Sequence, residues 1–309
     1  MQTKYLWTVA LIAALGLSAS AESLKWHEEK SLPAKPGGTL KVEASFQDVL
    51  VTIAPGSTIR VAVDIEVSSW PGDSKTYLDA LKPVYREEGN TILVRSRASH
   101  WTIGYSNCRG TIALKVPPGM ALDLRSGSGD CRIDGDTAGM PATCDTGSGD
   151  VEIHGAARSV TADTGSGDVR IRLAARAEKV KIDTGSGDVD FQGEAGEFEG
   201  DTGSGGITAM GLTGSARFDT GSGDVKAGWE RLPAGTSVTA DTGSGGVQLT
   251  LPAGTALSGL LGSSSGEIRC DFPGTLSSRE KRYELSGGGG SASVRVKTGS
   301  GDITIRKGA

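Results

Sequence analysis

The sequence is short of the residues on which many binding and catalytic sites depend. Aromatic residues make up 5% of the 309 residues, and there are only four cysteines and three histidines. The histidines, His27, His100 and His154, lie far apart without partners at metal-ligand spacing, which excludes a zinc site of the usual pattern. No phosphate loop, nucleophile elbow or C-x-x-C pair occurs. The composition therefore argues against the common catalytic classes.

A basic face is missing as well. Lys and Arg number 32 against 37 for Asp and Glu, which gives a formal net charge of -5, and both signs are spread along the chain. A nucleic-acid partner would require a concentrated positive surface. We therefore expect no nucleic-acid partner.

The first 21 residues have the pattern of a secretory signal peptide. Lys4 precedes an apolar run from Tyr5 to Leu17, and the small residues Ala19–Ala21 follow with A-x-A spacing, which predicts cleavage after Ala21. Glu22 follows where a lipoprotein would have cysteine, so no lipid anchor is expected. No later run reaches the length of about 20 apolar residues that a membrane helix needs. We expect an exported chain in the periplasm or at the cell surface, with no membrane span.

Glycine is abundant, with 47 residues, and much of it lies in a repeated segment of the form D-T-G-S-G-D-V. Successive copies are 18 to 22 residues apart, except for the last pair at 35. The copies start at Arg125, Asp145, Asp163, Asp183, Asp201, Asp219, Asp241, Gly262 and Lys297. A repeat of this length predicts a stacked array.

Short alternating segments flank each copy and predict two strands per repeat. Nearly every inward position of these strands is apolar, with Gly200 and Gly259 as the exceptions. Among the outward positions that alternate with the inward ones, Leu260 is the one apolar residue. About four buried side chains per repeat, at roughly 1.5 to 3 kcal/mol each, cannot offset an ordering cost of about 1 to 2 kcal/mol for each of some 20 residues. The repeats must therefore stack on one another, as in a solenoid.

A parallel β-helix is the favoured arrangement, and an antiparallel meander of hairpins is the alternative. Four outward residues, Arg132, Glu152, Arg170 and Asp190, alternate in charge after successive turns. Parallel stacking would place these opposite charges side by side. We divide the chain into a signal peptide (residues 1–21), an irregular β cap region (22–118) and a repeat β-solenoid (119–309).

The cap region carries most of the aromatic residues and has alternating strands at Thr58–Val67 and Thr91–Arg97. The segment Asp73–Lys82, followed by Pro83, is the one expected helix. It lies within an expected insertion from Ser68 to Asn90.

At the other end, a long polar loop is expected from Thr275 to Gly290. The final coil is expected to end the stack, with Arg306 and Lys307 discouraging edge pairing.

The chain resembles the bacterial putative-adhesin family of unknown function, whose members are exported proteins with β-helix repeats. The resemblance rests on the T-G-S-G-D repeats, on V-P-P-G and L-P-A-G turns at Val116–Gly119, Leu232–Gly235 and Leu251–Gly254, and on G-S-G-D-I-T-I at Gly299–Ile305. It implies a single-stranded right-handed parallel β-helix, an envelope or surface location and adhesion. It supplies no catalytic residues.

The motif D-T-G-S also surrounds the catalytic aspartate of aspartic proteases, in which two carboxylates share a proton. Here it occurs as a ladder at Asp145, Asp163, Asp183, Asp201, Asp219 and Asp241. A protease needs one pair in a cleft, so we interpret each copy as a turn, in which Asp and Thr accept backbone N–H bonds and Gly allows a tight corner.

Calcium binding is the other interpretation of these acids, because a second column runs beside the first at Asp130, Asp150, Asp168, Asp188, Asp224 and Asp302. Hard cations bind clusters of oxygen ligands. The nonapeptide motif of calcium-binding solenoids is not matched, however. We favour hydrogen bonds from each aspartate to its own turn, and we expect no cofactor.

Two smaller groups of residues complete the candidates. Cys131 and Cys144 form the one plausible disulfide among the repeats, since Cys270 is expected about seven coils from Cys131. The segment from His100 to Tyr105 is either an aromatic sugar-binding patch or part of the cap core, and the core is favoured.

The sequence as a whole favours a non-catalytic structural or binding module of the cell envelope, adhesin-like, whose partner is an envelope protein or a glycan. The alternatives are a polysaccharide-active β-helix enzyme and a regulatory partner in envelope stress.

Overall fold

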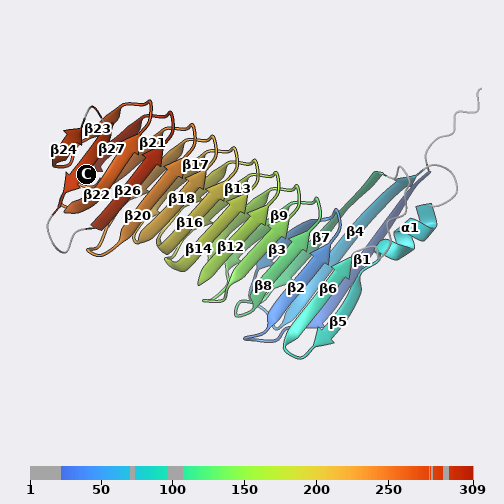
Figure 1. Ribbon diagram of the computed structural model, residues 1–309. Coiled ribbons are helices and arrows are strands. Elements are labelled where there is room, and N and C mark those ends of the chain that lie inside the picture. Colours follow the sequence, from blue (N-terminus) through green and yellow to red (C-terminus); the bar gives the residue numbers. More distant parts are fainter. Residues whose placement is uncertain are drawn as a thin grey trace, which may run out of the picture.

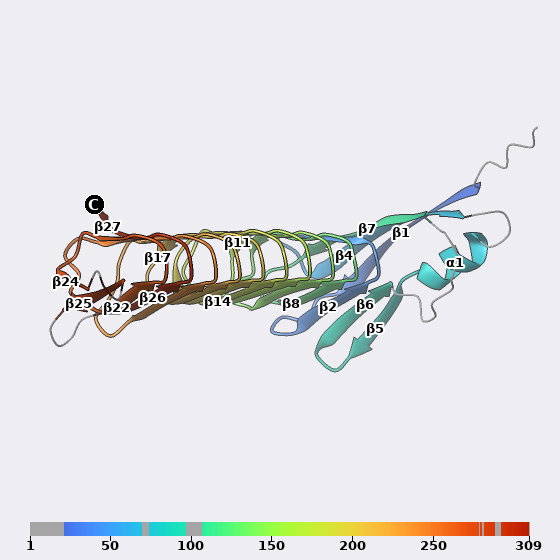
Figure 2. The same cartoon turned by 45° about the horizontal axis from the view of Figure 1, so that its top comes forward.

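The computed structural model describes residues 22–69, 74–96, 107–277, 279, 281–287 and 292–308. These residues form a long stack of coils, and each coil contributes one strand to each of two sheets that face one another (Figures 1 and 2). Apolar side chains from both sheets fill the space between them as one continuous core. Within the described residues, no helix combines the length and apolarity needed to cross a bilayer.

The first sheet has 13 strands among the described residues. In spatial order they are β1 (Glu22–Pro33), β4 (Thr58–Ser69), β7 (Asn107–Val116), β3 (Asp48–Ile53), β9 (Cys131–Asp136), β11 (Val151–Ala156), β13 (Val169–Leu173), β15 (Val189–Gln192), β17 (Ile207–Leu212), β19 (Val225–Trp229), β21 (Val247–Pro252), β27 (Ile303–Gly308) and β23 (Ile268–Cys270).

The second sheet has 14 strands in the same part of the chain. Their order is β24 (Gly274–Ser277), β25 (Arg282–Ser286), β22 (Leu257–Ser263), β26 (Ala292–Thr298), β20 (Ser237–Thr242), β18 (Ser215–Thr220), β16 (Ala195–Thr202), β14 (Ala177–Thr184), β12 (Ser159–Thr164), β10 (Ala142–Thr146), β8 (Ala121–Ser126), β2 (Thr39–Ala44), β6 (Thr91–Ser96) and β5 (Val84–Glu88).

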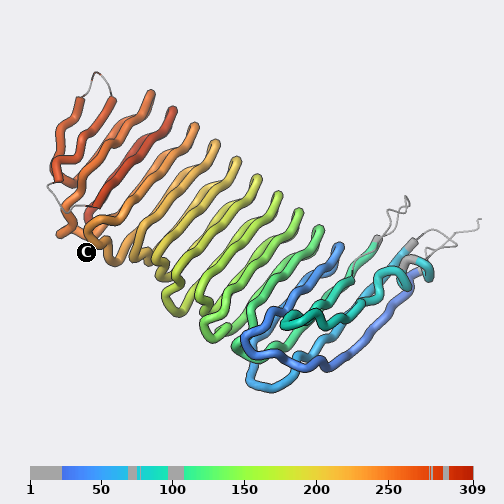
Figure 3. Tube along the Cα trace, turned by 60° about the horizontal axis from the view of Figure 1, so that its bottom comes forward, coloured from blue at the N-terminus to red at the C-terminus, as the bar shows by residue number. Residues whose placement is uncertain are grey.

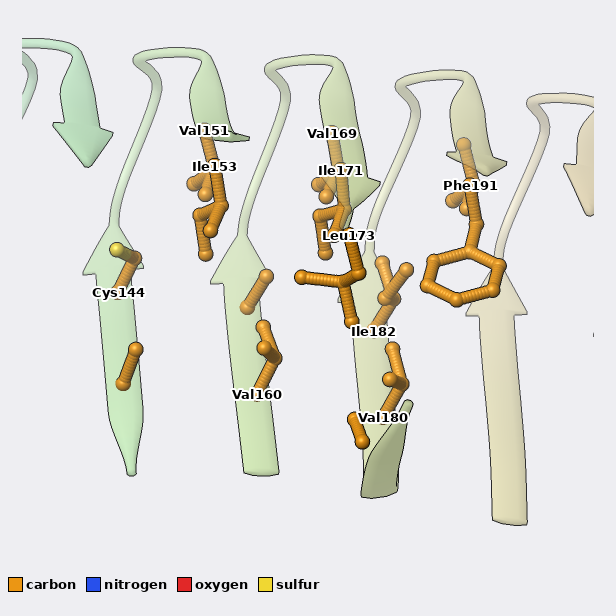
Figure 4. Packing of buried hydrophobic residues seen from close by; sticks show 14 of the residues in the cluster. Cys144, Val151, Ile153, Val160, Val169, Ile171, Leu173, Val180, Ile182 and Phe191 are labelled. Atoms are coloured by element: carbon orange, nitrogen blue, oxygen red, sulfur yellow. The ribbon is translucent and has the colours of Figure 1, made fainter. Parts of the chain in front are cut away.

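The repeats pair in parallel and in register, which confirms the favoured arrangement over the antiparallel meander. Val151 pairs with Val169 and Ile153 with Ile171, so equivalent positions of successive repeats lie side by side. The predicted inward positions are buried, and Figure 4 shows several of them pointing between the sheets. The exceptions are Gly259, Ile268 and Cys270 in one terminal coil, which are half-buried. The right hand of the winding stays a prediction.

Aromatic side chains thicken the core in the middle of the stack. The ring centroids of Phe191 and Phe198 are 5.1 Å apart, and those of Phe198 and Phe218 are 5.3 Å apart. The Trp229 ring meets Phe218 edge-on at 6.1 Å. Gly200 lies beside Phe198, where an added Cβ would meet the ring at 3.0 Å. Glycine at inward position 200 therefore leaves room for the ring of Phe198.

The region before residue 119 is more regular than the predicted irregular cap. Strands β2 and β3 already pair in parallel with β8 and β9, so the stacking crosses the division at 118/119, which stays a sequence-based boundary. Strands β1, β4 and β7 are long and antiparallel. The predicted helix is confirmed as α1 (Ser74–Leu81), which packs against β1 and β4 (Figure 1).

The C-terminal coils are threaded differently from the prediction. Strand β26 pairs with β20 on one side and β22 on the other, and β27 lies likewise between β21 and β23 (Figure 3). The last coil in sequence is therefore inserted between two earlier ones. The prediction that the final coil ends the stack is wrong, because β22 and β23 lie beyond it. The pairing of β27 with β23 covers Ile303–Ile305 and stops before Arg306 and Lys307.

The loop predicted from Thr275 to Gly290 contains regular structure. Strands β24 and β25 form an antiparallel hairpin, and β25 pairs with β22, which extends the second sheet. The hydroxyl of Tyr283 donates to the carbonyl of the buried Phe272 at 2.6 Å and ties the hairpin to the preceding segment.

Candidate functional site

A buried threonine closes each repeat turn, and we call these residues the turn threonines. The hydroxyl of Thr184 donates to the carbonyl of Gly167 in the preceding coil at 3.0 Å and accepts the N–H of Gly187 in its own turn at 3.0 Å. The same two bonds recur at Thr146, Thr164, Thr202, Thr220, Thr242 and Thr298, and at Ser126 and Ser263 in the equivalent place. The predicted turn role of threonine is confirmed.

Glycine in the turn is needed for close stacking. A Cβ on Gly187 would lie 1.8 Å from the carbonyl oxygen of Gly167 in the coil below. No side chain fits such a contact, so the second glycine of T-G-S-G follows from the spacing of the coils.

The second column of acids, which we call the corner aspartates, links one coil to the next. Oδ1 of Asp150 accepts the N–H of Asp168 at 2.8 Å, and Oδ1 of Asp168 accepts the N–H of Asp188 at 2.9 Å. Equivalent bonds are accepted by Asp48, Asp130, Asp188, Asp224 and Asp302. The prediction that these aspartates bond to their own turns is wrong: each satisfies the backbone of its neighbour.

The six D-T-G-S aspartates, which we call the face aspartates, form a separate column on the outer face of the second sheet. They pair in register from Asp145 through Asp163, Asp183, Asp201 and Asp219 to Asp241. Desolvation and the neighbouring carboxylates raise the pKa of Asp163 and Asp201 above the ordinary value. All six occupy the same register position on successive strands, so they form a column rather than a single protease-like pair. Within the described residues, no group of three or more His, Cys, Asp or Glu side chains is arranged to hold a metal ion.

Cys131 and Cys144 are buried in the core, whereas Cys108 and Cys270 are half-buried. The structure has no disulfide between Cys131 and Cys144. Burial raises the pKa of Cys131 to about 12, and burial raises that of Cys144 well above its ordinary value. The predicted Cys131–Cys144 disulfide is therefore absent from this structure, and its formation stays a prediction.

Beside the face aspartates, the outer face of the second sheet carries ordered ion pairs. Nζ of Lys179 lies 2.9 Å from Oε1 of Glu197 on the next strand. Arg217 pairs with Asp219 at 2.9 Å. The first pair joins neighbouring strands and the second lies within one strand, so side chains of both charges line this face beside the column of face aspartates.

The column of face aspartates changes sign at the C-terminal end. Asp241 pairs in register with Lys297, Lys297 with Gly262, and Gly262 with Arg282. A hollow of about 550 Å³ lies over these strands. Its charged lining consists of Arg279, Lys281, Arg282, Arg295, Lys297 and Asp241. We call this hollow the cationic notch.

Comparison with protein-family models identifies the architecture. A model described as Toastrack DUF4097 matches residues 39–306. The chain belongs to this family. The expected likeness to putative adhesins of unknown function is thereby confirmed. No curated protein matches the chain.

Solved structures similar to this family member have low sequence identity. A putative adhesin from Bacteroides fragilis NCTC 9343 is 14% identical over 91% of this chain and 97% of its own, with a TM-score of 0.42. A putative lipid binding protein from Parabacteroides distasonis ATCC 8503 is 16% identical over 92% and 97%, with a TM-score of 0.47. A putative adhesin from Parabacteroides merdae ATCC 43184 is 11% identical over 92% and 96%, with a TM-score of 0.40.

The sequence located the two acidic columns but missed the cationic notch. The available signal was the pair of degenerate copies at Gly262 and Lys297, which replace the aspartate with glycine and lysine. The candidate patch from His100 to Tyr105 and the signal peptide lie outside the described residues.

Proposed function

We propose that this member of the Toastrack DUF4097 family is an exported, non-catalytic binding module of the bacterial cell envelope. Its partner, an envelope protein or glycan, lies along the outer face of the second sheet. The signal-peptide pattern of residues 1–21 supports export.

One observation carries this proposal: the polar groups of the repeat motif divide into a structural set and a displayed set. The turn threonines and corner aspartates are used in hydrogen bonds between coils. The face aspartates repeat along the outside of the stack, strand after strand, and ion pairs such as Lys179–Glu197 lie on the same face. A surface of that kind suits an extended or repetitive partner, because equivalent contacts recur at each strand spacing of about 4.8 Å.

The same division speaks against a polysaccharide-active enzyme. Catalysis requires groups in unequal environments, so that one acts as acid and another as base. The face aspartates instead occupy one register position on successive strands, and the pKa values of Asp163 and Asp201 are raised by the same causes, desolvation and the adjacent carboxylates.

Excision of one coil tests the proposal. Removing residues 183–200 joins Ile182 to Asp201 and preserves the register, because Asp183 and Asp201 occupy paired positions. In a stacked array each coil contacts only its neighbours, so the shortened chain should fold. Its binding to isolated bacterial envelopes, measured by sedimentation, should weaken in a graded way, and excision of residues 201–218 should act alike.

An enzyme would respond differently, because displacing catalytic groups by about 1 Å can cost a hundredfold in rate. Turnover of a polysaccharide by the pure chain, abolished by one substitution that leaves folding intact, would overturn the proposal. So would a failure of the intact chain to bind envelopes at all.

A further inference from the structure

The cationic notch interrupts the acidic column in a specific way. Lys297 stands where the preceding repeats have aspartate, and Gly262 lies between two cations in the register: Lys297 pairs with it on one side and Arg282, from the antiparallel hairpin, on the other. The strands are about 4.8 Å apart, so the two cationic positions are separated by about 10 Å. This spacing leaves room for a ligand group between two positive side chains.

The floor of the notch is open. A Cβ built on Gly262 would meet no atom within 4 Å, and the backbone of this glycine does not lie in the left-handed region. Glycine is therefore not demanded here by stacking, in contrast with Gly187, whose Cβ would strike the coil below. The absence of a side chain at position 262 has no packing cause.

Two of the cations around the notch, Arg295 and Lys297, differ from Lys179 and Arg217 on the same face. Lys179 and Arg217 are each within 2.9 Å of a carboxylate. Within the described residues, Arg295 and Lys297 form no ion pair. These two charges are exposed on the sheet, beside the notch.

On the hairpin side of the notch, Lys281 has an unusual backbone conformation. Lys281 has φ of 50°, which is uncommon for a residue other than glycine. Its carbonyl accepts the N–H of Ser263 at 3.2 Å, and its Nζ donates to the carbonyl of Ser265 at 2.9 Å. The hairpin that carries Arg282 is thus fastened over the end of the second sheet.

The local charge opposes that of the molecule. Among the described residues that line the notch, five side chains are cationic and one, that of Asp241, is a carboxylate, in a chain whose net charge is -5. Glu284 follows on the same hairpin but does not line the hollow. The charges of Arg295 and Lys297, beside an open floor, are suited to a compact anion with several acceptor oxygens.

We propose that the cationic notch binds a phosphate group, which lies over Gly262 between Lys297 and Arg282, with Arg295 beside it. Arg supplies a planar fork that matches phosphate oxygens, and Lys supplies a point charge. The proposal rests on the proposed binding function and names the chemistry of one ligand group. The phosphate belongs either to a soluble or glycan-linked phosphoester or to a phospholipid headgroup.

Filling the notch with the residue of the preceding repeats tests this directly. Gly262→Asp restores the acidic column and places a carboxylate where the phosphate would lie. The matched control is Gly206→Asp, the same change at a glycine of the corner column, where a Cβ would make an ordinary contact at 3.4 Å. With inorganic pyrophosphate as the probe in isothermal titration calorimetry, we expect Gly262→Asp to raise the dissociation constant at least tenfold and Gly206→Asp to change it less than twofold.

A second variant keeps the test independent of the glycine. Lys297→Gln with Arg295→Gln should also weaken pyrophosphate binding at least tenfold, and circular dichroism checks that the fold persists. Binding should weaken as salt is raised, because exposed charges are screened. Sulfate and acetate at the same ionic strength serve as controls for general anion attraction.

Vesicles distinguish the two sources of phosphate. Binding to vesicles with phosphatidylglycerol but not to pure phosphatidylcholine, lost in Gly262→Asp, assigns a lipid headgroup. Pyrophosphate binding without vesicle binding assigns a soluble or glycan-linked phosphoester. The proposal is overturned if pyrophosphate does not bind, or binds Gly262→Asp as well as the unaltered chain. Envelope binding that survives in that case leaves the binding function standing and removes only the notch.

Discussion

The contribution of the turn threonines' two hydrogen bonds to stability can be tested directly. Thr184 is the best placed because it lies in the middle of the stack. Replacing Thr184 with valine keeps the shape of the side chain and removes its hydroxyl. The carbonyl of Gly167 loses a donor and the buried N–H of Gly187 loses its acceptor. Each buried backbone group left unsatisfied costs about 1 to 3 kcal/mol, so Thr184→Val should lower the free energy of unfolding by about 2 to 6 kcal/mol.

Two controls bracket this value. Thr184→Ser keeps the hydroxyl and loses one methyl, which is worth about 0.8 kcal/mol. Ser186→Ala changes an exposed residue of the same turn and should stay within about 0.5 kcal/mol of the unaltered chain.

The assay is urea unfolding followed by tryptophan fluorescence, with the buried Trp229 as a reporter. Hydrogen exchange of the Gly187 amide is measured in parallel, because stacked repeats can open locally. If Thr184→Val unfolds within 0.5 kcal/mol of the unaltered chain, the turn threonines are not what holds adjacent coils together, and the argument from their two bonds fails.

Three further predictions concern charge, thiols and calcium. The pKa values of Asp163 and Asp201 are raised in the folded chain, so their ionisation opposes folding at neutral pH and this cost disappears as the pH falls through the raised pKa. Asp183 adjoins both, and each neighbouring carboxylate repels it by about 0.9 kcal/mol in water before salt screening. Asp183→Asn should therefore raise the free energy of unfolding at pH 7 by roughly 1 kcal/mol and have little effect near pH 3. An equal effect at both pH values in urea titrations would contradict this. The raised pKa of Cys131 and of Cys144 should leave both thiols unlabelled by iodoacetamide in the folded chain and labelled in urea, and peptide mapping of the exported chain determines whether the two become joined. Millimolar calcium followed by a chelator should move the thermal midpoint by less than about 2 °C, whereas filled sites would move it by several degrees.

Much of the fold follows from the sequence because the repeat enforces it. A period of two around each turn fixes which side chains face inward, and equal spacing fixes the register, so Val169 and Ile171 could be placed in the core in advance. The turn role of threonine could be predicted from residue type alone. Its second bond, to the coil below, depends on stacking distance.

The parts that escaped prediction are those in which the chain departs from nearest-neighbour stacking. Nothing local in the segment from Ala292 to Thr298 states that it pairs with both β20 and β22. The residue type of the corner aspartates predicts bonds to their own turns, but the short side chain of aspartate reaches either its own turn or the next coil. The cationic notch combines residues from strands far apart in sequence, and only the threading brings Lys297 beside Gly262.

The inserted coil connects the C-terminal strands to the rest of the stack. Strands β22 and β23 reach the rest of the stack through β26 and β27, which follow them in the sequence. Without β26 and β27, strands β22 and β23 have no parallel neighbour on the side that faces the stack. The hairpin of β24 and β25 pairs with β22, so it is then also separated from the stack. A protease that trims the tail would therefore detach every strand from Leu257 onward, together with the cationic notch, while the coils before it stay stacked. Loss of the C-terminus would thus separate ligand capture from the scaffold in a single cut.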